Sequence, residues 1–327
     1  MKTAIVSQVK TFPAQLNIFV DFHLSIGFDK IYLFFDDPYD PSIDAFAGED
    51  RVVTIPTDAA LKKKWTRVPF YRDLKKHIGT NFIARQPLNM AIALDLAQKD
   101  KMDWLLHIDA DELFYCPAFS NVNEHFAQLS EKNIYIATYC NHEAIPESSD
   151  IVDHIREVTL FKKNFLALNP AQIEKITNVL QNNKRYFYFY GNGKSATRVV
   201  KGIQPFGPHN FLFSKKKLEP LHPFTQFSTD PCILHYPCCG FASFWDKYKV
   251  LGNFADTWFD TFVIADTFPV HVESRDIVNT SDMEAAKLFY QKNFIDAQLK
   301  PYDLFMKEEI YFRVSPPGRE RAAQSFL

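Results

Sequence analysis

Asp109 and Asp111 stand two residues apart, directly after an apolar run from Trp104 to Ile108. Side chains two residues apart in an extended segment point the same way, so these carboxylates would face one point and repel each other. A divalent cation with hard oxygen ligands relieves that repulsion and can also bind phosphate groups. The spacing therefore indicates a Mn²⁺ or Mg²⁺ site, with a solvated acidic turn as the alternative interpretation.

The apolar run before these aspartates has the composition of a buried strand. In open α/β sheets ligands bind at the carboxyl ends of the strands, which is where both aspartates would lie. We expect strands at 3–9, 30–35, 51–55, 104–108 and 134–139, with helices near 16–24 and 86–99. This order predicts the fold class α/β, with a doubly wound, mainly parallel sheet flanked by helices and a less regular C-terminal half.

The composition limits the classes of function. Lysines and arginines number 37 against 39 aspartates and glutamates, a net charge of −2, so no overall basic field favours nucleic acid as a partner. The five cysteines form no C-x-x-C pair, which argues against a zinc site or a disulfide framework. No signal-peptide core is present, and no stretch approaches the roughly 18 apolar residues of a membrane helix. We therefore expect a cytoplasmic protein without a transmembrane segment, or a piece cut from a longer protein.

The stretch from Thr57 to Arg85 is strongly basic. It holds eight lysines and arginines against two acids, Asp58 and Asp73. One interpretation is the solvated face of a surface helix. The other is a patch that contacts the acceptor or makes peripheral contact with a membrane surface, and the sequence leaves both interpretations open.

Four short segments occur in one order along the chain: Phe19 to Asp37, WLLHIDADELF from Trp104 to Phe114, Gly193-Lys194-Ser195 with Arg198 and His209, and Ile233 to Tyr236 followed by Lys247. Together they resemble segments of the family-2-like and family-92-like glycosyltransferases, in which the second one carries the metal motif. The likeness spans roughly residues 1 to 250. The chain departs from the group at 12–15 and 140–143, where the usual acidic residues and a glycine-containing segment are missing.

This resemblance implies a glycosyltransferase of the GT-A type. The expected donor is a nucleotide-diphosphate sugar, with a UDP-sugar as first choice, and the expected acceptor is a glycan or another hydroxyl compound. The family-92-like group inverts configuration, so the resemblance implies direct displacement at the anomeric carbon, with Mn²⁺ or Mg²⁺ as cofactor. We expect residues 1–140 to bind the donor and carry the metal motif, 141–280 to complete the acceptor and metal side of the same domain, and 281–327 to form a C-terminal helix and tail.

The resemblance also implies roles for polar residues outside the metal motif. The residues expected to contact the donor are Asp36 and Asp37 at the nucleoside, Arg85, Gln86 and Asn89 at the base, ribose or phosphates, and Lys194, Arg198 and Lys247 at the diphosphate. Taken alone, each has an ordinary structural alternative: a turn-forming pair of aspartates, a polar helix start, or a solvated charge.

A metal held by Asp109 and Asp111 would still have open coordination positions. By the same resemblance we expect His235 to fill one of them, with His209 as the alternative ligand. Direct displacement also needs a general base that takes the proton of the acceptor hydroxyl. Glu143 is the first candidate, and the other acids downstream of the motif are Asp150, Asp153 and Asp230.

Two other classes of function fit the same aspartates. A metal-dependent phosphohydrolase or nucleotidyltransferase would use them too, but it typically needs further acids for a second metal ion, and no second acidic cluster is evident in the sequence. A non-catalytic sugar-binding scaffold would keep the fold and the donor site without turnover.

Overall fold

The structure is a computed structural model and describes residues 1–10, 13–181, 185–213, 222–224 and 231–314. The chain divides into two compact units. The first unit comprises Met1–Tyr139 and Gly193–Ile233, and the second comprises Cys140–Asn192 and Leu234–Leu327. The first break thus falls beside the expected position at 140, whereas the segment that begins at Gly193 groups with the N-terminal half of the chain and not with 141–280.

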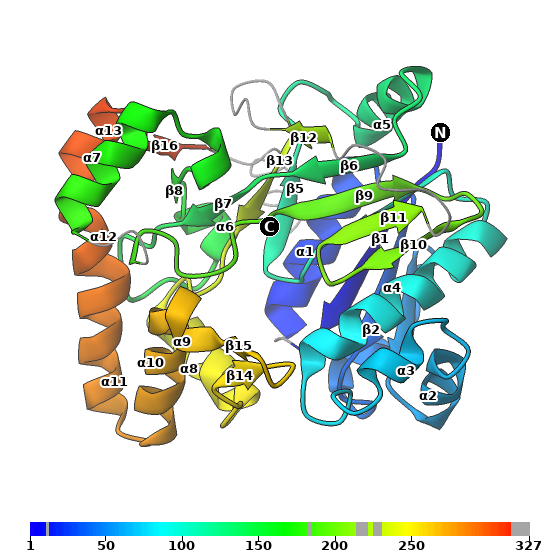
Figure 1. The fold of residues 1–327 in the computed structure, drawn as a ribbon, viewed down its shortest axis with the longest axis horizontal. Helices are drawn as coiled ribbons and strands as arrows, with labels where there is room; N and C mark the ends of the chain where they lie inside the picture. The colour runs from blue at the N-terminus through cyan, green and yellow to red at the C-terminus, as the bar shows by residue number, and fades with distance from the viewer. Residues whose placement is uncertain (11–12, 182–184, 214–221, 225–230, 315–327) are drawn as a thin grey trace. The chain divides into compact units, whose positions relative to one another are not determined.

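A seven-stranded sheet forms the centre of the first unit (Figure 1). Its strands, in spatial order, are β12 (His222–Phe224), β6 (Ile136–Tyr139), β9 (Lys194–Arg198), β4 (Trp104–His107), β1 (Thr3–Val9), β2 (Lys30–Phe35) and β3 (Val52–Pro56). β4, β1, β2 and β3 run parallel, whereas β9 runs antiparallel to both β4 and β6. The carboxyl ends of β1, β2 and β4 therefore meet at one edge of the sheet.

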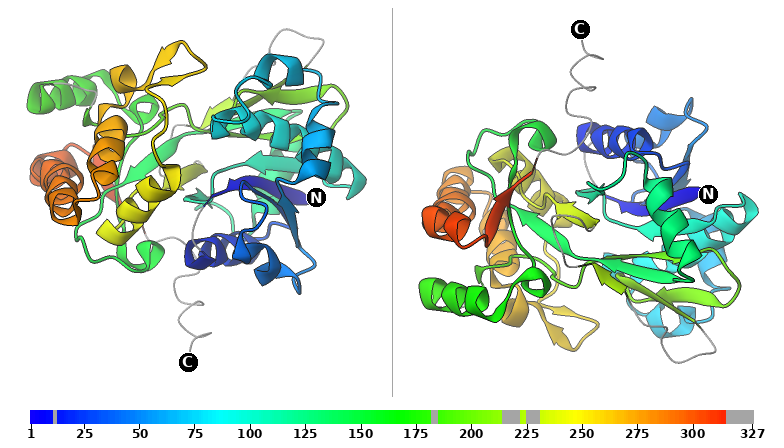
Figure 2. Two further views of the ribbon diagram at one scale, coloured as in Figure 1. Left: turned by 90° about the horizontal axis from the view of Figure 1, so that it is seen from below. Right: turned by 90° about the horizontal axis from the view of Figure 1, so that it is seen from above.

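Helices cover both faces of this sheet. α1 (Pro13–Ser25) and α5 (Val122–Glu131) pack on one face, while α4 (Phe82–Lys99) and α2 (Ala59–Trp65) pack on the other. Figure 2 shows α1, in blue, and α4, in cyan, on opposite sides of the first strands. The predicted α/β fold with a mainly parallel sheet flanked by helices is confirmed.

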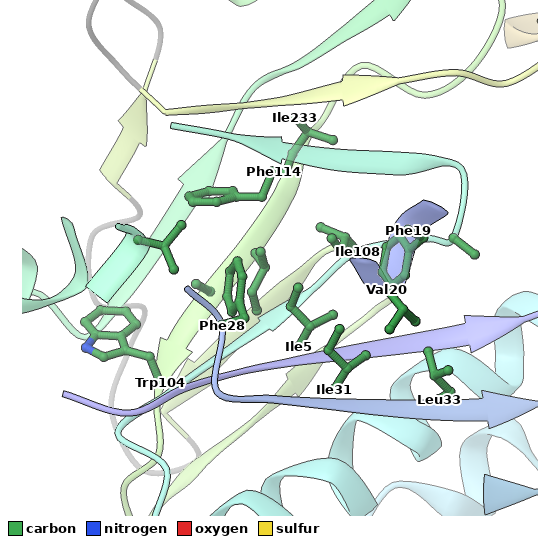
Figure 3. Packing of buried hydrophobic residues seen from close by; sticks show 14 of the residues in the cluster. Ile5, Phe19, Val20, Phe28, Ile31, Leu33, Trp104, Ile108, Phe114 and Ile233 are labelled. Atoms are coloured by element: carbon green, nitrogen blue, oxygen red, sulfur yellow. The ribbon is translucent and has the colours of Figure 1, made fainter. Parts of the chain in front are cut away.

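Alternate residues of each strand fill the two faces of the sheet. In β2, Ile31 and Leu33 pack in the cluster beneath α1, beside Ile5 (Figure 3), whereas Tyr32 and Phe34 pack in the cluster beneath α4. This alternation follows the period of two of an extended chain. Strands that are buried on both faces appear in the sequence as continuous apolar runs, so the positions of these strands could be predicted from the sequence.

The end of α1 is fixed by Gly27 and His23. Gly27 has a φ of +107°, a conformation that glycine adopts without strain, and the N–H of Phe28 bonds to the His23 carbonyl at 3.1 Å. The buried His23 ring donates from Nδ1 to the Phe19 carbonyl at 2.7 Å and accepts at Nε2 from the Phe114 N–H at 3.1 Å. His23 is therefore a satisfied core residue that joins α1 to the segment after the acidic motif.

The second unit contains three strands of a second sheet and a cluster of helices. Its strands β7 (Asn141–Ala144), β8 (Leu160–Lys162) and β16 (Tyr311–Arg313) pair antiparallel. The helices α8 (Phe241–Leu251), α10 (Pro269–Asn279) and α11 (Met283–Tyr290) pack around a cluster that includes Phe244 and Tyr248. Asn169 opens α7 (Pro170–Leu180) with a reciprocal capping box.

The remaining helices and strands are short. In chain order they are the 3₁₀ helix Pro41–Phe46, α3 (Tyr71–Leu74), β5 (Glu112–Tyr115), α6 (His154–Glu157), the 3₁₀ helix Phe165–Ala167, β10 (Ile203–Phe206), β11 (Asn210–Phe213), β13 (Cys232–His235), β14 (Thr257–Trp258), β15 (Phe262–Val263), α9 (Ile264–Thr267), the π-helix Gln291–Asp296, α12 (Ala297–Leu299) and α13 (Tyr302–Lys307). Within the described ranges, no helix has the length and apolar character needed to cross a membrane.

Three buried histidines make the folded protein sensitive to acid. Burial lowers the pKa of His23 and of His142 to about 3 and that of His125 to about 4, from an ordinary value of about 6.5. Below this value the unfolded chain binds protons that the folded chain excludes, so stability falls as the pH falls. We expect these three histidines alone to lower the free energy of unfolding in urea by about 4 kcal/mol per pH unit between about pH 6 and pH 4, and His209 and His271, whose pKa values burial also lowers, to add to the fall. An unfolding free energy that stays level from pH 7 to pH 5 would contradict this expectation.

Candidate active site

The acidic motif lies at the carboxyl edge of the first unit's sheet. β4 ends at His107, and Asp109 and Asp111 lie in the turn that leads into β5, which begins at Glu112. Oε2 of Glu112 accepts a hydrogen bond from the Asp109 backbone N–H at 2.7 Å, which closes this turn. Glu112 is fully buried, and its Oε1 has no hydrogen-bond partner among the described residues. The motif therefore gathers three carboxyl groups at the end of one strand.

A lysine from a neighbouring strand meets this motif. Because β9 runs antiparallel to β4, it begins beside the end of β4, and its first residue is Lys194. Nζ of Lys194 lies 2.6 Å from Oδ2 of Asp109 and 3.9 Å from Oε2 of Glu112. The Lys194 side chain is 1% exposed, whereas that of Asp109 is 23% exposed. The ammonium is thus enclosed by protein, and Asp109 is the member of the pair that reaches solvent.

The electrostatics of this cluster follow from burial and from the close charges. Burial alone would lower the pKa of Lys194, but the carboxylates of Asp109 and Glu112 outweigh it and hold that pKa above its ordinary value. Burial raises the pKa of Glu112 well above its usual range, and the Lys194 ammonium only partly opposes the rise. Lys194 therefore stays charged, while the protonated form of Glu112 is favoured.

Helix α4 ties two strand ends together through consecutive residues. Arg85 donates from Nε and Nη2 to the two carboxylate oxygens of Asp36, at 2.6 and 2.8 Å, and Asp36 directly follows β2. Gln86 donates from Nε2 to Oδ1 of Asp109 at 2.8 Å. The structure therefore brings four predicted donor residues, the fourth being Lys194, to the edge where β2 and β4 end.

The two aspartates after β2 differ in their environments. Asp36 is mostly buried in its bidentate ion pair with Arg85. Asp37 is exposed, and its Oδ1 accepts a hydrogen bond from the backbone N–H of Tyr39 at 2.9 Å, as in an Asx turn. Asp36 is therefore held in one orientation, and Asp37 is the one that faces solvent.

Two other residues predicted to contact the donor, Asn89 and Arg198, lie away from the acidic motif. Asn89 is buried between β1 and α2: its Nδ2 donates to Oε1 of Gln8 at 2.8 Å, and its Oδ1 accepts from Nε1 of Trp65 at 2.9 Å. Arg198 lies opposite Trp104, the first residue of β4, because β9 runs antiparallel. Asn89 thus joins helices to the sheet, and Arg198 lies at the opposite edge from Asp109.

His209 lies beside the same cluster. Its Nδ1 lies 2.9 Å from the carbonyl oxygen of Gly193, the residue before Lys194. Burial lowers the pKa of His209 to about 3, and the Lys194 ammonium adds to the effect. Burial and the same ammonium also lower the pKa of His107, the last residue of β4. Both rings are therefore neutral at physiological pH, the form in which histidine can bind a metal.

Glu143, the first candidate for the general base, is buried in the second unit. Its side chain is 1% exposed, and its Oε1 lies 2.7 Å from Nζ of Lys162. Its carboxylate also accepts hydrogen bonds from the backbone N–H groups of Tyr188 and Phe189, each at 3.1 Å. Lys162 in turn donates to Oε1 of Gln298 at 2.9 Å. Within this unit Glu143 is held by Lys162 and by two backbone N–H groups, and its expected role as the base stays a prediction.

The other three acids considered for this role have different environments. Asp150 is exposed, in the loop between β7 and α6. Asp153 is the N-cap of α6 and accepts a hydrogen bond from the Arg156 N–H at 3.1 Å. Asp230 lies outside the described residues. Asp150 is thus the described acid of this set whose carboxylate is most open to solvent.

His235 and Lys247 also belong to the second unit. The buried His235 ring packs against Phe189 and Tyr190, with ring centres 5.6 and 5.3 Å away. Nζ of Lys247 donates to the Pro237 carbonyl at 2.9 Å and lies 4.8 Å from the centre of the Phe189 ring. The expected roles of His235 as a metal ligand and of Lys247 at the diphosphate stay predictions.

The two aspartates of the acidic motif offer oxygen ligands that suit a divalent cation. No group of three or more His, Cys, Asp or Glu side chains converges into a metal site within the described ranges. A carboxylate, however, has about four lone-pair positions. Asp109 uses one on each oxygen, for Gln86 and Lys194, and is still partly exposed. Together with the partly exposed Asp111, it offers the hard oxygen ligands that Mn²⁺ and Mg²⁺ accept. The two aspartates therefore fit such an ion on their solvent side.

A cavity of about 570 Å³ lies at the other edge of the same sheet. Lys2, Lys30 and Arg51, which stand at the starts of β1, β2 and β3, line it together with Asp29 and Asp100. Ligands of open α/β sheets bind at the carboxyl ends of the strands, and this cavity lies at the amino ends. The cavity is therefore distinct from the donor site expected at Asp109.

Two features of the site were not predicted from the sequence. One is the burial of the Glu112 carboxyl group. This burial could have been recognised from the apolar residues Leu113 and Phe114, which directly follow Glu112 and are buried with it. The other is the direct pairing of Lys194 with Asp109. That pairing depends on an antiparallel strand between β4 and β6, which the order of predicted strands does not reveal.

Comparison with known proteins supports a glycosyltransferase. No family model matches the chain. Glycosyltransferase-like At2g41451 of Arabidopsis thaliana is 26% identical over 232 residues, which cover 68% of this chain and 50% of that protein. Glycosyltransferase-like At3g57200 of the same plant is 28% identical over 228 residues, which cover 66% of this chain and 43% of that protein. The resemblance to glycosyltransferases is confirmed. The chain spans about half the length of these curated relatives.

Solved structures show a weaker likeness. Core-mannan synthase A from Aspergillus fumigatus, in its Mn/GDP form, aligns with 61% of this chain and 60% of its own, at 8% identity and a TM-score of 0.28. The mannosyltransferase Ktr4p from S. cerevisiae aligns with 45% of this chain and 40% of its own, at 13% identity and a TM-score of 0.25.

Removal of the buried ammonium should destabilise the first unit. Lys194→Met would leave Asp109 without its buried counter-charge, which we expect to lower the free energy of unfolding by about 3 kcal/mol. The measurement is urea unfolding at neutral pH. Lys201→Met, at an exposed lysine just beyond the same strand, is the matched control and should change stability little. Equal free energies of unfolding for the Lys194 variant and the wild type would show that the ion pair does not stabilise the fold.

Proposed function

We propose that this chain is a metal-dependent glycosyltransferase that moves a sugar from a nucleotide-diphosphate sugar, with a UDP-sugar as first choice, to a hydroxyl group of a glycan or another acceptor. The observation that carries the proposal is the meeting of Asp109, Lys194, Gln86 and the Asp36–Arg85 pair at the carboxyl edge of a parallel sheet. The likeness to two glycosyltransferase-like proteins supports the class of reaction.

The side chains at this edge suit the parts of such a donor. Carboxylates accept hydrogen bonds, and Asp36 and Asp37 offer oxygens to the N–H groups of a base or to the hydroxyls of a ribose. Arg85 holds Asp36 in one orientation through two hydrogen bonds. Lys194 and Gln86 hold Asp109 in the same way at the end of β4. Pre-oriented groups of this kind reduce the ordering that binding would otherwise require.

A divalent cation, Mn²⁺ or Mg²⁺, is part of the proposal. Asp109 and Asp111 would hold it, with His235 or His209 as a further ligand. When bound, such an ion supplies positive charge that offsets the charge on the diphosphate leaving group. Lys194 and Gln86 fix the Asp109 side chain, so that its remaining lone pairs stay on the solvent side of the motif.

We further propose, from the family resemblance, that transfer inverts the anomeric carbon by direct displacement. The acceptor hydroxyl would then lose its proton to a general base as the new glycosidic bond forms and the nucleoside diphosphate leaves. Because Glu143 is buried in an ion pair, the exposed Asp150 is the better candidate among the described acids downstream of the motif.

The proposal predicts that Asp111 is essential for turnover. Asp111→Asn keeps size and shape but removes a charged ligand, so we expect donor hydrolysis or sugar transfer to fall by about 100-fold or more, with little change in melting temperature. Activity is measured as release of nucleoside diphosphate from UDP- and GDP-sugars in the presence of manganese. Asp95→Asn, at an exposed position of α4, is the matched control and should keep wild-type activity. Near-normal turnover of the Asp111 variant would reject the proposed role of the motif.

A further inference from the structure

Six exposed cations cover the region of α2 and α3 in the first unit. We define the α2–α3 basic surface by these residues: Lys62, Lys63, Lys64, Arg67, Arg72 and Lys75. All six are exposed, and within the described ranges none of them takes part in an ion pair. The surface is thus a set of uncompensated positive charges.

The fold determines that these charges face solvent. Leu61 and Trp65 lie four residues apart in α2, so they share one face of that helix, and both are buried together with Val68. Three lysines therefore occupy the outward part of the helix. α2 and α3 both pack on α4, so the two short helices present their charges from one support (Figure 1).

Charge is strongly segregated along this chain. Residues Thr57 to Arg85 carry eight lysines and arginines and two aspartates, a net charge of +6. The whole chain has a net charge of −2, so the other residues together carry −8. An extended anionic surface would therefore attract the α2–α3 basic surface and repel most of the remaining chain, which would orient the protein on that surface.

We propose that the α2–α3 basic surface binds the anionic face of a lipid bilayer. A bilayer with acidic headgroups attracts each nearby lysine or arginine without demanding a fixed geometry, which suits flexible side chains spread over two helices. A single small anion would instead need converging donors, and the cavity of about 570 Å³ in this unit is lined by other residues. None of the exposed large hydrophobic residues of the described chain falls between 57 and 85, so the contact would be electrostatic and reversible.

This surface is independent of the proposed donor site. Its six residues make no contact with Asp109 or Lys194 in the hydrogen bonds and ion pairs of the acidic motif. Bilayer binding can therefore be measured without any donor, and its failure would leave the proposed glycosyl transfer untouched.

The test is co-sedimentation of the full chain with phosphatidylcholine vesicles that contain or lack phosphatidylserine. We expect binding only to the anionic vesicles, and loss of that binding as the salt concentration rises. Replacement of Lys62, Lys63 and Lys64 by alanine should weaken binding roughly 100-fold at low salt. Donor hydrolysis and melting temperature should stay at their wild-type values.

Two controls make this result decisive. A second triple variant, with alanine at the exposed Lys99, Lys132 and Lys201 of the same unit, makes the same change in net charge and should bind nearly as well as the wild type. Equal weakening in both triple variants would show a response to net charge alone and would overturn the proposal. So would equal binding to the two kinds of vesicle, or binding to duplex DNA at salt concentrations that release the protein from anionic vesicles.

Discussion

The ion pair between Lys194 and Asp109 is the interaction on which the proposed donor site depends. The carboxylates of Asp109 and Asp111, close together at the end of β4, would repel each other. One enclosed ammonium offsets that repulsion, and it is available because β9 runs antiparallel and begins where β4 ends. The charge balance of the acidic motif therefore depends on the antiparallel direction of β9, which brings Lys194 beside Asp109.

The second unit uses the same kind of pair with a different result. Glu143 and Lys162 are both 1% exposed, and their polar atoms are engaged by backbone N–H groups and by Gln298. Such a pair specifies an arrangement of the chain but leaves no group for a ligand. At the acidic motif, by contrast, Asp109 keeps part of its carboxylate in contact with solvent. The exposure of Asp109 to solvent distinguishes its pair with Lys194, a candidate site, from the enclosed pair of Glu143 and Lys162.

Much of the first unit could be predicted from the sequence, because its strands are buried on both faces and its helices are long. The strands β1 and β2 fall where the apolar runs place them, and the position of Asp109 at a strand end follows from the run before it. The antiparallel entry of β9 could not be predicted, since it depends on contacts between segments far apart in the chain. For the same reason Lys194 could be named as a basic candidate, but its partner could not.

The candidate residues that lie away from the acidic motif share one physical feature. Polarity in a sequence does not distinguish a side chain that serves a ligand from one that satisfies the protein interior. Asn89 bonds to Gln8 and Trp65, and Glu143 bonds to Lys162, so both are polar residues of the core. Arg198 lies opposite Trp104, away from Asp109, because β9 runs antiparallel to β4. Each of these distinctions requires the three-dimensional partners of the residue.

We propose that the carboxyl edge of the sheet at Asp109 binds a nucleotide-diphosphate sugar. The most direct measurement is the melting temperature of the wild-type protein with a panel of UDP- and GDP-sugars, in manganese and in a chelator, because a ligand that binds only the folded state raises it. We expect a rise with at least one donor, larger in manganese than in the chelator, and no rise in the Asp109→Asn variant. A cooperative melting transition that no donor shifts under either condition would contradict it.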